Sequence, residues 1–176
     1  MDTMNEAMRN LISRRSVRQY LDKPVPEDIL NRILEAGTWA PSAMNRQSAI
    51  MIAVTDRALR DRLSTMNASI MGREGTDPFY GAPVVVVVLA DRNIPAHVYD
   101  GTLVMENLML AAHAEGLGSC WIHRAKEEFD SPEGKEILHK LGITGDYEGI
   151  GHCILGYPAG ELPEGKPRKA QFIYRV

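Results

Sequence analysis

Positively charged side chains gather at the two ends of this chain. Residues 1–18 carry a net charge of +2 and residues 164–176 carry +3, whereas the whole chain carries −3, so the stretch between them carries −8. Guanidinium, ammonium and hydroxyl groups together bind the oxygens of a compact polyanion such as a phosphate monoester. If the two ends meet in space they form such a site, and otherwise they are solvated charges at separate ends. The residues are Arg14, Arg15, Ser16 and Arg18 near the start and Lys166, Arg168 and Lys169 near the end.

Two glycine-containing segments resemble nucleotide-binding motifs but lack residues that those motifs require. Residues 116–121 hold the first two glycines of a dinucleotide-binding turn, yet Trp121 occupies the third glycine position and a predicted helix precedes the segment. Residues 160–166 fit the spacing of a P-loop, but Pro167 stands where the magnesium-binding Ser or Thr is needed. We therefore expect neither a Rossmann site nor a P-loop.

The histidines and cysteines do not predict a metal site or a nucleophile. The five histidines lack metal-ligand spacing, and His113 on an apolar predicted helix is interpreted as a core residue. Cys120 has no nearby candidate base and is interpreted as a packed thiol. Together with Cys153 it forms no CxxC pair, so neither a disulfide framework nor a zinc site is indicated. We expect no bound metal.

The composition is typical of a globular protein of one domain. The chain has 176 residues, of which 44% are hydrophobic and 24% are charged. No apolar run is long enough to span a membrane and the first residues lack the features of a signal peptide, so we expect a cytoplasmic protein without a membrane partner. The acidic body of the chain argues against a nucleic-acid-binding surface.

Apolar periodicity predicts four main helices. The first is amphipathic and ends at the basic residues 14–18, and the second runs from Pro26 to Gly37. The third covers residues 101–115, with Asp100 as its predicted cap, and is apolar nearly all round, which predicts burial in part by a second subunit. The fourth opens at Ser131-Pro132 and stops at Gly142. The apolar positions of the first helix are Met4, Met8, Leu11 and Ile12.

Three buried strands are predicted at residues 49–55, 83–90 and 151–156. The second contains five consecutive valines, which is typical of a central strand buried on both faces. Asp56 is expected to cap a short helix through Leu63. Residues 66–81 show no period and are expected to form a long loop or a mobile cover over a site.

Four segments resemble, in the same order, the flavin-binding motifs of the nitroreductase family. The first is R-x-S-x-R at residues 14–18 and the second is P-S-x-x-N-x-Q at residues 41–47. Residues 116–122 resemble the third motif, and the terminal K-P-R-K at residues 166–169 resembles the fourth. The resemblance covers nearly the whole chain, residues 1–176, as one FMN-binding domain. Ser48 departs from the pattern, because many members of the family have proline there.

The resemblance implies contacts between the basic residues and FMN. Its phosphate would be bound by Arg14, Arg15 and Ser16 from one end of the chain and by Arg168 with Lys169 or Lys166 from the other. Arg18 corresponds to the family's basic residue near the flavin N1 and C2 carbonyl, where a cation stabilises the anionic reduced flavin.

The two middle motifs imply contacts with the flavin ring. Residues 41–47 resemble a loop that reaches across a dimer to the partner's flavin, with Asn45 and Gln47 as amide donors and acceptors. The alternative for this loop is a plain connection between a helix and a strand. The implied ring-contacting residues are Pro41, Ser42, Ala43, Met44, Asn45 and Gln47 in this loop, and Trp121, Ile122 and His123 beside the ring.

The resemblance implies an α+β fold, with a mixed, mostly antiparallel sheet flanked by helices, in a homodimer with two FMN sites. The implied reaction is a ping-pong exchange in which NADH or NADPH reduces FMN at N5 and a small acceptor, such as a nitroaromatic or a quinone, is then reduced. No side chain is expected to act as a catalytic acid or base. The alternatives are a dehalogenating or flavin-fragmenting enzyme on the same scaffold, a non-catalytic FMN-binding or storage protein, and an interaction domain without cofactor.

Overall fold

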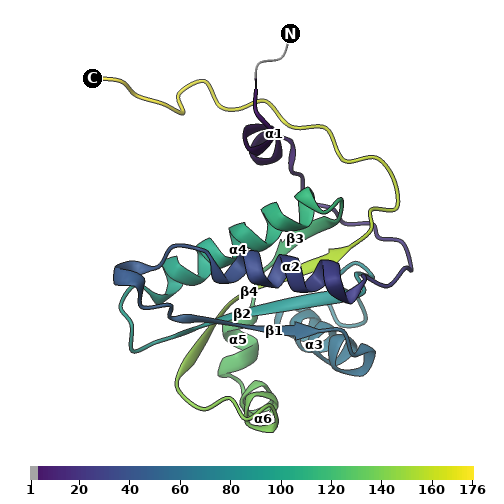
Figure 1. Cartoon of the computed structure of the whole chain (residues 1–176). Helices are drawn as coiled ribbons and strands as arrows, with labels where there is room; N and C mark the ends of the chain where they lie inside the picture. Colours follow the sequence, from purple (N-terminus) through teal and green to yellow (C-terminus); the bar gives the residue numbers. More distant parts are fainter. Residues whose placement is uncertain (1–3) are drawn as a thin grey trace.

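A four-stranded sheet with helices on both faces organises the chain. The computed structural model describes residues 4–176, and its strand order is β1-β2-β4-β3, with every neighbouring pair antiparallel (Figure 1). The strands are β1 (Ala49–Val54), β2 (Val84–Asp91), β3 (Gly118–Ile122) and β4 (Tyr147–Gly156). One isolated parallel bridge joins Ser16 to Ser119 beside β3. The predicted α+β class with a mostly antiparallel sheet is confirmed.

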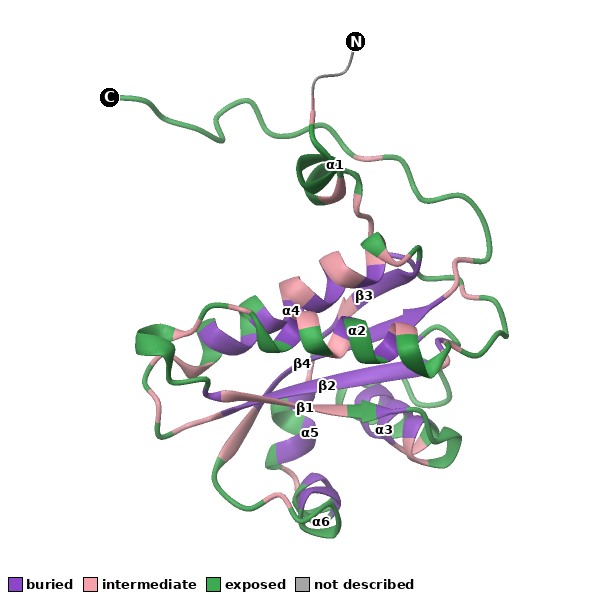
Figure 2. Ribbon diagram, in the orientation of Figure 1, coloured by how far each residue is buried: buried purple, intermediate pink, exposed green. Residues whose placement is uncertain are grey.

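Strand β2 is the centre of the sheet, as its valine run predicts. It pairs with β1 on one side and β4 on the other, and Val85 through Ala90 are fully buried. Because side chains alternate along a strand, Val86 and Val88 join the core on one face while Val85 and Val87 join the core on the other. Figure 2 shows this buried strand between helices whose outer surfaces are exposed.

Helices α2 (Glu27–Thr38) and α4 (His97–Ala114) cover one face of the sheet. Gly37 permits the close approach of α2, since a Cβ there would lie 2.9 Å from the sulfur of Met51. Helix α4 begins earlier than predicted, so Asp100 is not its cap but a buried residue of its first turn. In the single subunit Tyr99 and Leu103 are exposed, so burial on nearly all sides stays a prediction that depends on a second subunit.

Helices α3 (Arg57–Ile70), α5 (Ala125–Asp130) and α6 (Pro132–Lys140) lie on the other face. Asp56 caps α3 as predicted, accepting a hydrogen bond of 2.8 Å from the amide of Leu59. The expectation of a loop from residue 66 is wrong for residues 66–70, which continue α3. The apolar period is interrupted there because α3 buries polar side chains, including that of Asn67.

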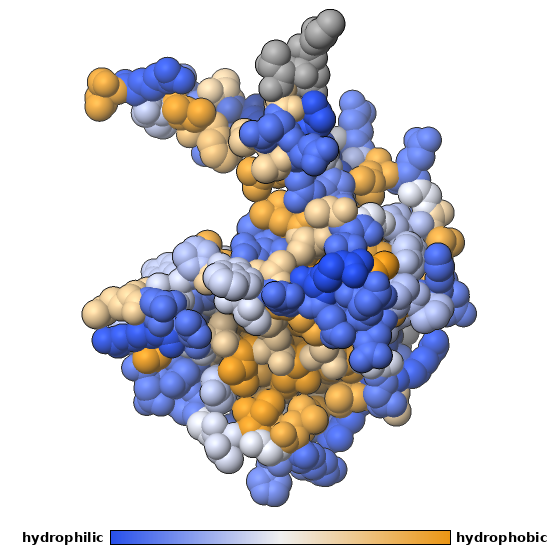
Figure 3. All heavy atoms as spheres, in the orientation of Figure 1, coloured by the Kyte–Doolittle hydropathy of each residue, from blue (hydrophilic) through white to orange (hydrophobic). Residues whose placement is uncertain are grey.

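The two ends of the described chain lie over the α2–α4 face. Helix α1 (Glu6–Ser13) contains no buried residue, and Met8, Leu11 and Ile12 expose about half of their surface. Asn10 donates to the carbonyl of Leu110 at 3.0 Å, which attaches α1 to the end of α4. Figure 3 shows an open hollow between the body and the overhang formed by α1 and the C-terminal segment. Among the helices described here, none is both long and apolar enough to cross a membrane.

Candidate functional site

The two ends of the chain meet through backbone pairing. The amide of Val17 donates to the carbonyl of Ser119 at 2.9 Å, which places the segment after α1 along the outer edge of β3. On its other side, the amide of Leu21 donates to Tyr157 and the amide of Ala159 donates to Gln19. The N-terminal basic motif is therefore fixed between β3 and the start of the C-terminal segment.

This pairing brings both basic clusters to one cavity of about 770 Å³, a size suited to a small cofactor. From the first cluster it is lined by Arg14, Arg15, Ser16 and Arg18, and from the second by Lys166 and Arg168. The predicted meeting of the chain ends is thus present in the structure. The ends are therefore not separate, although Lys166 and Arg168 remain exposed.

Two residues of this region carry buried polar atoms without partners. The Nε and Nη1 atoms of Arg14 and the Oγ of Ser119 have no hydrogen-bond partner among residues 4–176. Buried donors of this kind are normally satisfied, because leaving one unpaired costs about 1–3 kcal/mol. Unpaired guanidinium donors require an acceptor, and an anionic oxygen is the strongest one available to them.

The electrostatic field at this site is positive. His113, at the end of α4, lies with its Nε2 2.7 Å from the hydroxyl of Ser13. Partial burial and the nearby charges of Arg14 and Arg15 lower the pKa of His113. The same field that disfavours a second cation here favours a bound anion.

Not every predicted basic residue is equally available to a ligand. Arg15 donates through Nη1 to the carbonyls of Ile12 and Arg14, both at 2.8 Å, and so caps the end of α1. Its guanidinium also touches the C-terminal segment, because a Cβ on Gly165 would lie 2.2 Å from it. Lys169 does not line the cavity, and its ammonium group lies 5.2 Å from the centre of the Phe172 ring.

The third motif continues along β3 from the same cavity. Trp121 packs partly against the α2–α4 core, whereas the side chain of Ile122 belongs to the core on the opposite face. His123 is exposed, and its carbonyl accepts a hydrogen bond from Asn67 at 2.8 Å. Trp121 is therefore on the sheet face that α2 and α4 cover, while Ile122 could meet a ligand only through its backbone.

The second motif lies at the opposite end of α4. The amide of Ala43 donates to Asp100 in the first turn of α4, whereas Ser13, next to the basic motif, contacts His113 in its last turn. These two anchors are thirteen positions apart along the helix, which corresponds to about 20 Å. Figure 1 shows the 3₁₀ turn η1 (Ala43–Asn45) far from α1 and β3. One subunit therefore does not bring this loop to its own basic cavity.

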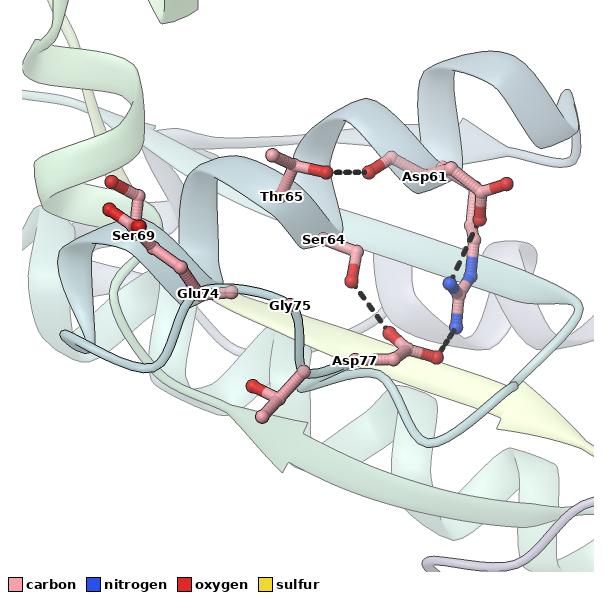
Figure 4. A pocket seen from close by; sticks show the side chains of 10 residues that line it. Asp61, Ser64, Thr65, Ser69, Glu74, Gly75 and Asp77 are labelled. Carbon is pink, nitrogen blue, oxygen red and sulfur yellow. Dashed lines mark hydrogen bonds and ion pairs between the residues drawn. The ribbon is translucent and has the colours of Figure 1, made fainter.

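A second cavity, of about 540 Å³, lies on α3 and the loop after it. Figure 4 shows that Asp77 faces two polar neighbours: it binds the guanidinium of Arg60 at 2.6 Å and accepts from the hydroxyl of Ser64 at 2.6 Å. These contacts hold the loop rather than leave groups free for a ligand. None of the predicted site residues lines this cavity.

Two residues of the site region are missed by the sequence analysis. Ser119 lies inside the third motif, but only the bridge to Ser16 shows that its hydroxyl belongs beside the first motif. Asp100 is predicted as a helix cap, and only the structure shows it buried against the second motif. In both cases the relevant neighbour is far away in the sequence.

The cysteines and acidic residues show no further reactive centre in the described residues. Both cysteines are buried free thiols, and burial raises the pKa of Cys153, which keeps it protonated. Across residues 4–176 no cluster of three histidine, cysteine or acidic side chains could hold a metal ion.

Known proteins match this chain along nearly all of its length. A Bacillus subtilis protein named FMN reductase (NAD(P)H) is 35% identical over 191 residues, covering 96% of this chain and 72% of that protein. A Bacteroides fragilis nitroreductase solved with bound FMN has a TM-score of 0.87 and 34% identity, covering 98% of this chain and 100% of that one. A Desulfitobacterium hafniense nitroreductase with bound FMN also has a TM-score of 0.87, with 26% identity and coverage of 99% and 100%.

The match to the family itself spans the elements that build the site. The model of the Nitroreductase family matches residues 11–157, which run from α1 to the residue after β4 and include the first three motifs. Because this is most of the chain, the protein belongs to the nitroreductase family.

Proposed function

We propose that this protein binds FMN and uses it to pass reducing equivalents from NADH or NADPH to a small organic acceptor such as a nitroaromatic or a quinone. The observation that carries the proposal is the basic cavity at the meeting chain ends, which Arg14 lines, together with the buried donors without partners on Arg14 and on Ser119, the bridge partner of Ser16. A phosphate monoester supplies the acceptor oxygens that these donors lack. The FMN-containing structures and the FMN reductase among the relatives support this choice of ligand.

The residues of the cavity have two proposed roles: some would bind the phosphate of FMN, and one would stabilise the reduced form of the flavin ring. Arg14, Ser16 and Arg168 would hold the phosphate, and Arg15 would keep α1 and the C-terminal segment in place around it. FMN would supply hydride transfer, which no side chain of this protein can perform. Arg18 would place a positive charge near the ring and favour its anionic reduced form.

The proposal includes a homodimer in which residues 41–47 of one subunit complete the flavin site of the other. Its support is that this loop and the basic motif are anchored near opposite ends of α4, about 20 Å of helix apart. The exposed apolar side chains of α1 also favour a partner surface. Both cysteines are free thiols, which supports a reducing compartment such as the cytoplasm.

The absorption spectrum of the purified protein, with identification of the released chromophore, tests the cofactor. FMN near one equivalent per subunit is expected, whereas FAD or a colourless protein that binds no added FMN contradicts the proposal. Steady-state oxidation of NADH and NADPH with a quinone then separates an enzyme from a storage protein. Parallel lines in double-reciprocal plots are expected for alternating substrates at one site.

A further inference from the structure

The loop of the second motif is strained and yet exposed. Met44, Asn45 and Gln47 have φ angles of 54°, 54° and 48°, in the left-handed region that side chains other than glycine rarely adopt. Residues 43–47 are all exposed, so packing in a core does not hold this shape. Backbone strain of this kind persists only where specific contacts impose it. The contacts that impose it here are polar.

Asp100 makes the contacts that fix both ends of the loop. One carboxylate oxygen accepts from the amide of Ala43 at 2.9 Å, and the other accepts from the hydroxyl of Ser48 at 2.7 Å. Asp100 itself is 3% exposed and sits in the first turn of α4, where the helix dipole favours a negative charge. The carboxylate therefore joins a rigid helix to the two residues that bracket the strained segment.

The two hydrogen bonds that Asp100 accepts, from Ala43 and Ser48, are called the clamp below. Ser48 connects this clamp to the sheet. It is buried, and its carbonyl accepts from the amide of Asp91 at 2.9 Å at the end of β2. Within the loop, the amide of Gln47 donates to the hydroxyl of Ser42, and its side-chain amide donates to Asn45. Asp100 and Ser48 thus define where the loop starts and ends, and the internal bonds define its shape.

We propose that Asp100, acting with Ser48, is a positioning residue that holds residues 43–47, with Met44, Asn45 and Gln47 left-handed, in the shape needed to complete the flavin and acceptor site of the neighbouring subunit. This inference rests on the proposed function. Asp100 touches neither cofactor nor substrate in this role, because it acts through the Ala43 amide and the Ser48 hydroxyl. Without the Asp100 carboxylate, the loop backbone relaxes toward negative φ. The side chains of Asn45 and Gln47 then move away from the positions that the site requires.

Hydrogen–deuterium exchange of the purified wild-type protein and of variants tests the clamp independently of activity. In Asp100→Ala, amides in residues 41–49 should exchange at least about tenfold faster, because the Ala43 bond is lost and the loop opens locally. In Asp100→Asn, exchange should stay near that of the wild type, since the amide can accept from Ala43 and donate to Ser48. Unchanged exchange in Asp100→Ala overturns the clamp.

Kinetics with 1,4-benzoquinone as acceptor test whether the clamp serves the site. Asp100→Ala should lower kcat/KM for the quinone by about 10- to 100-fold, as expected for a displaced contact, and Asp100→Asn should recover most of it. Asp77→Ala is the matched control, because Asp77 organises a different loop through the amides of Phe79 and Gly81. It should lower stability without a comparable loss of kcat/KM.

The outcomes separate this inference from the proposed function. A wild-type protein without FMN or NAD(P)H oxidation overturns the proposed function, while the exchange measurement still decides whether Asp100 holds the loop. An active wild type with a loosened loop but unchanged kcat/KM in Asp100→Ala overturns the positioning role, as does an equal loss in Asp100→Asn. Ser48→Ala, which removes one of the two bonds, supplies the same comparison if Asp100→Ala does not fold.

Discussion

Among single residues, Arg14 gives the most direct indication of a bound ligand, because its guanidinium has buried, unpaired donors. Its Nε and Nη1 atoms are buried without partners, whereas Arg15 beside it donates through Nη1 to two backbone carbonyls. Two adjacent arginines in one motif therefore have different tasks. Arg14 has guanidinium donors that lack an acceptor. Arg15 donates to the carbonyls at the end of α1, directly beside Arg14.

We predict that Arg14→Ala weakens FMN binding by about 10- to 100-fold, because a charge-assisted hydrogen bond contributes about 1.5–3 kcal/mol. Arg168→Ala should have a smaller effect, since Arg168 is exposed and already donates to the carbonyl of Lys166. Titration of the apoprotein with FMN by flavin fluorescence measures both. Arg57→Ala, an arginine exposed on α3, is the control. An Arg14 variant with the affinity of this control would remove Arg14 from the site.

At the scale of elements, the site depends on how closely the segment after α1 approaches β3. A Cβ on Gly118 would lie 2.8 Å from side-chain carbons of Val17, closer than real Cβ contacts allow. The absence of a side chain at Gly118 thus permits the bond between the Val17 amide and the Ser119 carbonyl. This is the contact that positions the first motif.

Gly118→Ala should therefore weaken FMN binding, because Val17 must move away from β3 and shift Arg14 and Ser16 with it. The double variant Gly118→Ala/Val17→Ala should recover part of the affinity, since it removes the two γ carbons of Val17 and leaves only the Cβ of residue 17 close to the new side chain. Equilibrium dialysis of FMN against both variants measures the effect, with circular dichroism to verify the fold. Equal affinity of the single variant and the wild type would show that the approach of these segments does not position the site.

The loop after α3 gives a prediction about pH that is independent of the cofactor. Burial alone would raise the pKa of Asp77, but hydrogen bonds from Arg60, Ser64 and two loop amides lower it below the ordinary value of 3.8. A carboxyl with a lowered folded pKa contributes stability that is fully present above the unfolded pKa and is lost as pH falls through the folded pKa.

Asp77→Asn should therefore be less stable than the wild type near pH 7, and the difference should shrink as pH falls below about 4. Urea unfolding at pH 7, 5 and 3 measures it. Glu74→Gln replaces an exposed carboxylate on the same loop and serves as the comparison. A gap between Asp77→Asn and wild type that stays constant down to pH 3 would contradict the prediction.

At the scale of the whole molecule, the two halves of the proposed flavin site lie at opposite ends of α4. The exposed face of α1 and the exposed aromatic rings of Trp39 and Tyr99 leave apolar surface that one subunit does not cover. A second copy related by two-fold symmetry would bring the loop of each subunit to the cavity of the other, because such an interface is self-complementary.

Mixed dimers should then recover activity that neither parent has. One parent carries Arg14→Ala/Arg168→Ala and the other carries Asn45→Ala/Gln47→Ala, so each homodimer has two damaged sites. In the mixed dimer, one site contains both pairs of substitutions. The other site combines an unsubstituted basic cluster with an unsubstituted loop of residues 41–47. Differently tagged subunits, co-expressed and purified through both tags, should regain FMN and NAD(P)H oxidation at about half of the sites.

If the loop and the cluster act on the flavin of their own subunit, every site of the mixed dimer keeps one lesion and nothing is regained. Verified mixed dimers no more active than their parents would therefore exclude a site shared between subunits. Each parent must first melt near the wild-type temperature, so that a loss of activity reports the site and not the fold.

The sequence by itself determined which side chains the proposed site contains and the parts of the fold that depend on local patterns. Local features include the arginines and the hydroxyl of the first motif, the amides of the second motif and the valine run of β2, because side-chain type and periodicity are properties of neighbouring residues.

Tertiary structure decided which of these features meet. Pairing of residues 17–21 with β3 and with residues 157–159 joined the chain ends. Burial turned an expected helix cap, Asp100, into the anchor of a loop 52 residues or more away in the sequence. Burial also explains why α3 stays helical through Asn67. The side chain of Asn67 donates to the buried Glu128 on α5, a partner that no local sequence pattern reveals.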